Sequence, residues 1–144
     1  MVDFLLFLHV IGAIGMGFYL VLPFLLGRAS RLAGSGQEGL AEGLINGNRI
    51  AQYFLILQFL TGGYLISQND YTVVWIVLVI LLFLAIAALA GIMTKPLKRI
   101  VASIQAGQSA TSHIKKAQTM SFIILLLFLI TIYLMKYPFY QELP

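Results

Sequence analysis

Long apolar segments alternate with two basic segments along this chain. Residues 27–50 hold three Lys or Arg side chains and residues 94–118 hold five, which together are eight of the nine basic residues. The apolar segments that flank and separate them are residues 4–26, 50–67, 72–93 and about 120–137. An α-helix rises ~1.5 Å per residue, so about 20 apolar residues cross a hydrocarbon core ~30 Å thick. The pattern therefore predicts an all-α membrane protein with a bundle of four transmembrane helices.

The composition agrees with this fold class. Of the 144 residues, 60% are hydrophobic and only 10% are charged, which is far from the average for soluble domains. Four spans leave little chain over, so we expect residues 1–144 to form a single transmembrane domain without a separate soluble one. The chain contains no cysteine, which excludes disulfides, thiolate metal sites and covalently attached haem.

The positions of Lys and Arg predict the orientation of the bundle. Cytoplasmic loops of membrane proteins carry an excess of positive charge, and the basic residues here flank the first and third connections. The opposite side carries Asp3, Asp70 and Glu142, with Lys136 as its only basic residue. We therefore expect both termini and the short turn at 68–71 outside the cell, an N-out/C-out topology.

The two cytoplasmic connections differ in character. After Pro96, apolar residues recur at helical spacing opposite Lys98 and Arg99. This predicts a short amphipathic helix near residues 96–105 that lies on the inner membrane surface, where anionic lipid attracts its charge. The other connection is rich in glycine over residues 33–39, which predicts a flexible segment before the second span.

The two halves of the chain share a weak similarity. Residues 49–52 (Arg-Ile-Ala-Gln) enter the second span as residues 115–118 (Lys-Lys-Ala-Gln) enter the fourth. Two basic residues also follow the first span and the third. Both halves would cross the membrane in the same direction, so a repeat would give two parallel helical hairpins related by an axis along the membrane normal. Coincidence is the alternative, because the match is short.

His9 is the most informative polar residue inside the spans. Polar side chains in a bilayer need an internal partner or a polar cavity, and His9, Gly12 and Met16 share one stripe of the first helix. Glycine and alanine residues crowd the same helix, so a neighbouring helix or a flat ligand can approach its backbone closely. His9 therefore marks a candidate binding site in the outer leaflet.

The depth of each span predicts which residues share the layer of His9. They are Thr61, Gly62 and Tyr64 from the second span, Trp75 from the third and Tyr133 from the fourth. An imidazole at this depth suits haem iron or copper, with Met135 as a soft second ligand, and an organic ligand such as a quinone is a further reading. The alternative is a histidine that hydrogen-bonds across helices beneath an ordinary belt of interfacial aromatic residues.

Part of the sequence resembles a group of small bacterial integral membrane proteins akin to the copper-resistance-D-like membrane domain. The resemblance lies in Phe-Leu-His-Val-Ile-Gly-Ala at residues 7–13 and Pro-Phe-Leu-Leu-Gly-Arg at residues 23–28, with a weaker likeness in Thr-Gly-Gly at residues 61–63. It implies a helical bundle in the bacterial plasma membrane, linked to copper or haem handling. Only His9 maps onto the pattern of that group.

Three functions compete for such a chain. The leading one is an accessory, assembly or structural subunit of a larger membrane complex, and the second is a haem- or copper-binding protein that uses His9. The third is a small-molecule transporter or channel, which the lack of charge at mid-membrane disfavours. No enzyme signature is present. The expected partners are the lipid bilayer and a larger complex or a second copy of the chain, which the small residues Ala87 and Gly91 would suit, and not nucleic acid.

Overall fold

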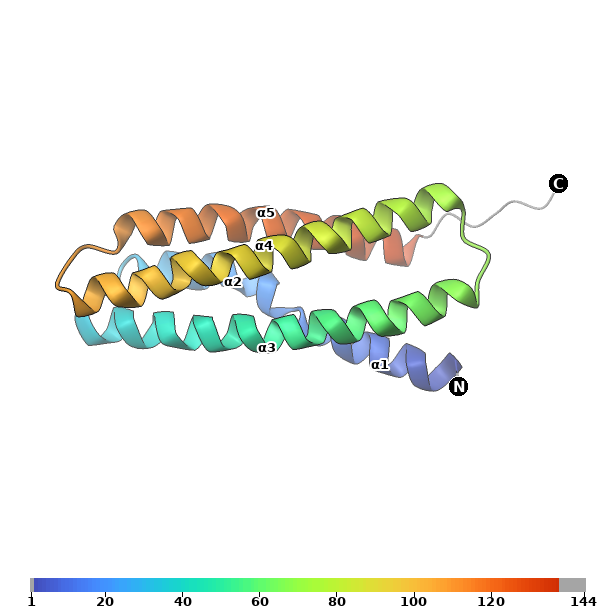
Figure 1. Ribbon diagram of the computed structural model, residues 1–144, viewed down its shortest axis with the longest axis horizontal. Helices are drawn as coiled ribbons and strands as arrows, with labels where there is room; N and C mark the ends of the chain where they lie inside the picture. Colours follow the sequence, from blue (N-terminus) through green and yellow to red (C-terminus); the bar gives the residue numbers. More distant parts are fainter. Residues whose placement is uncertain (1, 138–144) are drawn as a thin grey trace.

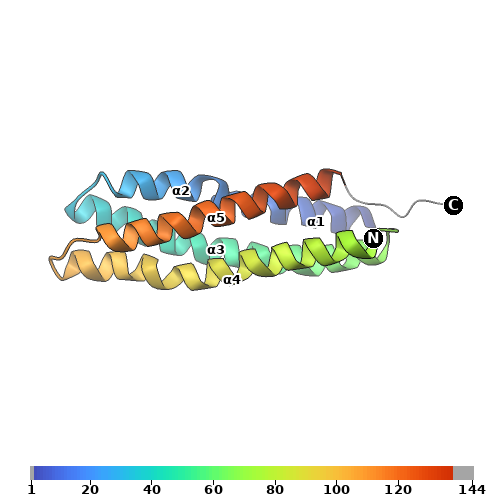
Figure 2. The same cartoon turned by 90° about the horizontal axis from the view of Figure 1, so that it is seen from above.

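The protein is a bundle of long antiparallel helices (Figures 1 and 2). The computed structural model describes residues 2–137, and Glu142, which the orientation argument uses, lies outside them. Its helices are α1 (Val2–Gly15), α2 (Phe18–Ala29), α3 (Gly34–Ser67), α4 (Val73–Gln105) and α5 (Thr111–Lys136). Together α1 and α2 form one rod, and all four rods are long and apolar enough to cross a membrane. The predicted four-helix, all-α fold is confirmed, and the protein is a multi-pass membrane protein.

The two ends of the bundle differ in charge. The connections after α2 and after α4 lie together at one end (Figure 1), which we call the basic end because most Lys and Arg residues lie towards it. The α3–α4 turn and the N-terminus lie at the opposite end, which we call the terminal end. With 33 residues, α4 is about 50 Å long, whereas about 30 Å suffices to cross the hydrocarbon. The bundle therefore continues beyond the hydrocarbon at its basic end.

The core is concentrated in the half of the bundle nearer the basic end. Each rod contributes a fully buried side chain there, such as Leu26, Leu44, Leu97 and Ile114. A smaller cluster around Trp75, Val79 and Leu134 lies towards the terminal end. The main core thus runs from the apolar spans, where Leu22 and Ile86 are buried, past the hydrocarbon to Leu97 and Ile114 at the basic end.

Both connections are more helical than the sequence predicts. Residues 96–105 are helical, as expected, but they continue α4 without interruption instead of forming a separate helix on the membrane surface. Their apolar residues Leu97 and Ile100 are fully buried in the bundle core. The glycine-rich residues predicted to be flexible are also helical, because α3 begins at Gly34. The two extensions pack together, so each covers the apolar face that the other would expose.

The first span is broken near its middle. The sequence predicts one helix over residues 4–26, but α1 ends at Gly15 and α2 begins at Phe18. The Gly17 amide donates to the Ile14 carbonyl at 2.9 Å, one residue short of the α-helical pattern. A Cβ at Gly17 would lie only 2.8 Å from that carbonyl oxygen, so the break requires glycine at this position.

The break gives the two parts of the first rod different neighbours. In the half nearer the basic end, α2 packs against both α5 and α3, whereas α1 packs against α3 and forms no comparable interface with α4 or α5 among the described residues. Figure 1 shows α1 emerging on the side of α3 that faces away from α5. The terminal half of the bundle is therefore less completely enclosed.

The burial pattern supports the internal repeat. In the first and third rods, Leu22 and Leu26 correspond to Ile86 and Ala90 at an offset of 64 residues, and all four are fully buried. In the second and fourth rods the offset is 66, and buried residues again coincide: Leu44 with Ala110, Ala51 with Ala117, and Leu55 with Ser121. The structure thus consists of two similar hairpins, α1–α3 and α4–α5, packed side by side.

Candidate functional site

His9 lies in the interface between α1 and α3. Its Nδ1 atom is 2.8 Å from Oγ1 of Thr61, and Thr61 is buried. The imidazole also covers Gly62, where a Cβ would lie 3.2 Å from Cε1 of the ring. The structure therefore brings together three of the residues that the sequence placed in one layer.

The hydrogen bonds around Thr61 define the tautomer of His9. The Thr61 hydroxyl donates to the Leu57 carbonyl at 2.8 Å, as hydroxyls inside transmembrane helices commonly do. A hydroxyl proton used in this way favours Thr61 as the acceptor of the bond from His9, and hence the tautomer in which Nδ1 of the imidazole carries the hydrogen. In that tautomer Nε2 presents a lone pair that has no hydrogen-bond partner within residues 2–137. A hydrogen-bonded Nδ1 with a free Nε2 is the arrangement in which histidine binds metals.

One turn further along α1, glycine allows close packing on α3. A Cβ at Gly12 would collide with the side chain of Gln58, and one at Gly15 would collide with the ring of Phe54. The Oε1 atom of Gln58 is buried and has no hydrogen-bond partner among the described residues. Gly12 and Gln58 thus place an unpaired acceptor on the same interface as His9.

The remaining predicted site residues lie apart from this interface. Met16 is buried in the main core beside the helix break, and Tyr64 is half-buried on α3. Trp75 is 2% exposed. It donates from Nε1 to the Leu134 carbonyl at 2.9 Å and stacks on Tyr71 with ring centroids 4.2 Å apart. The bond to Leu134 holds α4 to α5, and the ring contact joins α4 to the turn before it, so neither contact involves the helix that carries His9.

The two predicted residues from α5 point outwards. Tyr133 is 61% exposed and Met135 is 41% exposed, and α1 has no substantial interface with α5 among the described residues. No group of three or more His, Asp or Glu side chains in residues 2–137 is placed to hold a metal ion. A ligand bound at His9 would therefore contact α1 and α3 first.

A buried polar network that the sequence did not reveal lies at the level where the main core begins. Asn48 is 2% exposed and accepts a hydrogen bond from the Tyr19 hydroxyl at 2.9 Å. Its amide donates to the Ala90 carbonyl at 3.0 Å and to Oγ1 of Thr94 at 3.3 Å. One side chain thus links α2, α3 and α4. Asn48 precedes the charged Arg49 in a polar stretch, so hydropathy alone places it outside the core.

Two grooves on the bundle lie away from His9. One groove of about 460 Å³ runs along α4 from Gly91 to Ala102, and another of about 340 Å³ lies between α2 and α5. Both are at the basic end. Comparison with models of known protein families, with curated proteins and with solved structures gives no match.

Proposed function

We propose that the protein is an accessory subunit of a larger complex in the bacterial cytoplasmic membrane. The observation that carries this proposal is the position of α1. Within residues 2–137 this helix has one substantial helix interface, with α3, whereas α2 in the same rod has two. A transmembrane helix of another subunit would give α1 its second interface.

A photo-crosslinking amino acid tests this proposal at two lipid-facing positions. Ile14 on α1 is 72% exposed and Leu81 on α4 is 58% exposed. We expect irradiation of cells of the native host to give one discrete protein adduct from position 14 and none from position 81. Adducts at both positions would reflect random collisions, and their absence at position 14 would leave α1 facing lipid. Either result would contradict the accessory role.

A second candidate function is haem or copper binding through His9. It is favoured by the Nδ1–Thr61 bond, which leaves Nε2 as a free ligand atom, and by Gly62 beside the ring. Since α1 is covered on one side only, a flat ligand could reach Nε2 from the membrane. The resemblance to the copper-resistance-D-like group points in the same direction.

The absorption spectrum and metal content of protein purified from its native host test the second function. A haem protein would show a Soret band and a copper protein a stoichiometric metal, and either should be lost in His9→Ala. Thr61→Val is the matched control, since it keeps the shape of the side chain but removes the acceptor for Nδ1. It should weaken binding without abolishing it. Colourless, metal-free protein would exclude this function.

A further inference from the structure

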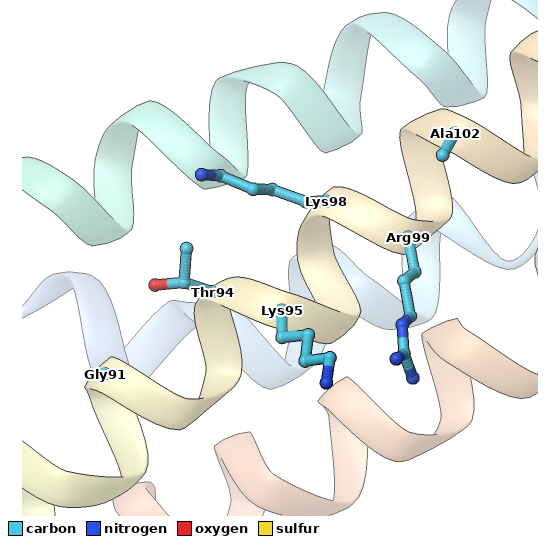
Figure 3. A pocket seen from close by; sticks show the side chains of 6 residues that line it. All are labelled: Gly91, Thr94, Lys95, Lys98, Arg99 and Ala102. Atoms are coloured by element: carbon cyan, nitrogen blue, oxygen red, sulfur yellow. The ribbon is translucent and has the colours of Figure 1, made fainter.

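Two grooves at the basic end carry unpaired positive charge. The larger one follows one face of α4 and is lined by Gly91, Thr94, Lys95, Lys98, Arg99 and Ala102. Figure 3 shows that Lys98 extends to one side of α4 while Lys95 and Arg99 extend to the other, so the charges flank the helix. None of these three side chains forms an ion pair within residues 2–137. Their charge is therefore available to a ligand.

The smaller groove lies between α2 and α5. Its basic residues are Arg28 and Arg31, and its apolar walls include Phe24 and Phe122. The two rings meet edge to face with centroids 6.3 Å apart. At the floor of the groove, the Gln118 amide donates to the Pro23 carbonyl at 3.2 Å. This groove thus combines an apolar wall with two guanidinium groups.

The repeat relates the two grooves to each other. Gly27 and Arg31 of the smaller groove correspond to Gly91 and Lys95 of the larger one, at the offset of 64 that relates the first and third rods. A glutamine covers each glycine from the neighbouring hairpin. Nε2 of Gln118 lies 3.3 Å from a Cβ placed at Gly27, and Nε2 of Gln52 lies 4.0 Å from one placed at Gly91. The two grooves therefore share a glycine beside a glutamine and a basic residue one turn further on, although α4 alone lines the larger groove and the smaller one lies between α2 and α5.

Each groove crosses the boundary between apolar and polar surface. The third apolar segment ends at Met93 and the fourth begins near Met120, so Gly91 and Phe122 lie just inside the hydrocarbon. The basic side chains begin just beyond it. Phospholipids place their phosphate at this depth, with acyl chains on one side and water on the other, and basic pockets between transmembrane helices bind such headgroups.

We propose that each groove binds the phosphate headgroup of an anionic phospholipid, so that the protein carries two such lipids at its basic end, one for each hairpin. Arg28 and Arg31 contact the phosphate in the smaller groove, and the guanidinium geometry suits bidentate contact with two of its oxygens. Lys95, Lys98 and Arg99 serve the same purpose in the larger groove. The acyl chains lie along the apolar residues of each groove.

Native mass spectrometry in detergent tests this proposal with phosphatidylglycerol as the anionic probe and phosphatidylcholine as the neutral one. The wild-type protein should retain two molecules of phosphatidylglycerol and no comparable phosphatidylcholine. The double variant Arg28→Gln, Arg31→Gln should retain one, with binding at the altered groove weakened about thirtyfold. The triple variant Lys95→Gln, Lys98→Gln, Arg99→Gln should also retain one, and the combined variant none.

A matched control separates groove binding from general attraction. Lys115 and Lys116 are exposed and line neither groove, so Lys115→Gln, Lys116→Gln removes the same charge as the arginine pair and should retain both lipids. Equal losses in the control and the arginine variant would overturn the proposal, as would two lipids retained by the combined variant. Displacement of the lipid by excess inorganic phosphate would assign the grooves to a free anion instead. All altered side chains are exposed, so each variant should keep the wild-type melting temperature.

Discussion

One buried amide side chain joins three of the helices. Asn48 accepts from the Tyr19 hydroxyl and donates to the Ala90 carbonyl and to Thr94. Hydrogen bonds between transmembrane helices stabilise a fold by about 1 kcal/mol each, so the network adds modestly to stability. Its larger effect is to select one register of the helices. In any other register the buried amide would lose its partners, which costs free energy.

The Tyr19 hydroxyl gives a clean test of this network. Tyr19→Phe keeps the ring but leaves Oδ1 of Asn48 without its donor, and we expect a loss of about 1 kcal/mol in the free energy of unfolding. Tyr53→Phe is the control, since Tyr53 is 66% exposed. This variant should have the free energy of unfolding of the wild type. Denaturation in mixed micelles measures both. Equal stability of the two variants would contradict a structural role for the network.

At the scale of elements, α1 depends on glycine for its contact with α3. Gly12 and Gly15 lie four and one residues before Met16, where the first rod breaks, and both face side chains of α3. Small residues at such positions let helix backbones approach, and close packing replaces the hydrophobic effect as the main attraction within lipid. The interface between α1 and α3 is therefore sensitive to any added volume.

The loss of stability caused by a leucine substitution should depend on what each glycine faces. Gly15→Leu would meet the Phe54 ring and should cost about 1–3 kcal/mol of stability. Gly12→Leu would meet the flexible end of the Gln58 side chain, which can move, and should cost less. Gly63→Leu is the control, because nothing lies near a Cβ at Gly63. Melting temperatures in detergent should follow this order. Equal melting temperatures for the three variants would place this face of α1 against lipid.

At the scale of the whole molecule, the bundle is about 50 Å long, and its main core extends beyond one face of the hydrocarbon. The part beyond the hydrocarbon consists of the end of α2, the first half of α3, the last third of α4 and the start of α5. Its surface carries most of the positive charge. By the positive-inside rule, we expect this part to face the cytoplasm, which gives the orientation prediction that follows.

The absence of native cysteine makes the orientation directly measurable with single-cysteine variants. We expect Asn69→Cys, in the turn at the terminal end, to react in intact cells with a thiol reagent that cannot cross the membrane. Ser35→Cys and Gln108→Cys, at the basic end, should react only after the cells are opened. All three positions are exposed, so access and not burial decides the result. The reverse pattern would invert the topology.

The outcomes of the sequence predictions follow from the range of the interactions involved. Four spans are readable from sequence because apolar length and charge placement act locally on each segment. The break at Gly17 cannot be predicted from the sequence, since glycine is equally compatible with a straight helix packed closely on a neighbour. Residues 96–105 show an amphipathic pattern whether their apolar face meets lipid or protein, and only the extension of α3 decides that it meets protein.

The candidate site divides in the same way. Depth in the membrane correctly groups His9 with Thr61 and Gly62, since α1 and α3 form an antiparallel pair in which depth fixes the neighbours. Depth cannot tell which helices touch. Trp75 bonds to α5 and Tyr133 is exposed, so neither residue joins the interface of His9. The sequence by itself determined the number of spans and the end that carries the charge, because the bilayer acts on each segment separately. Which faces meet, where the first rod breaks and which polar groups pair were decided by the tertiary structure, because those depend on contacts between segments far apart in the chain.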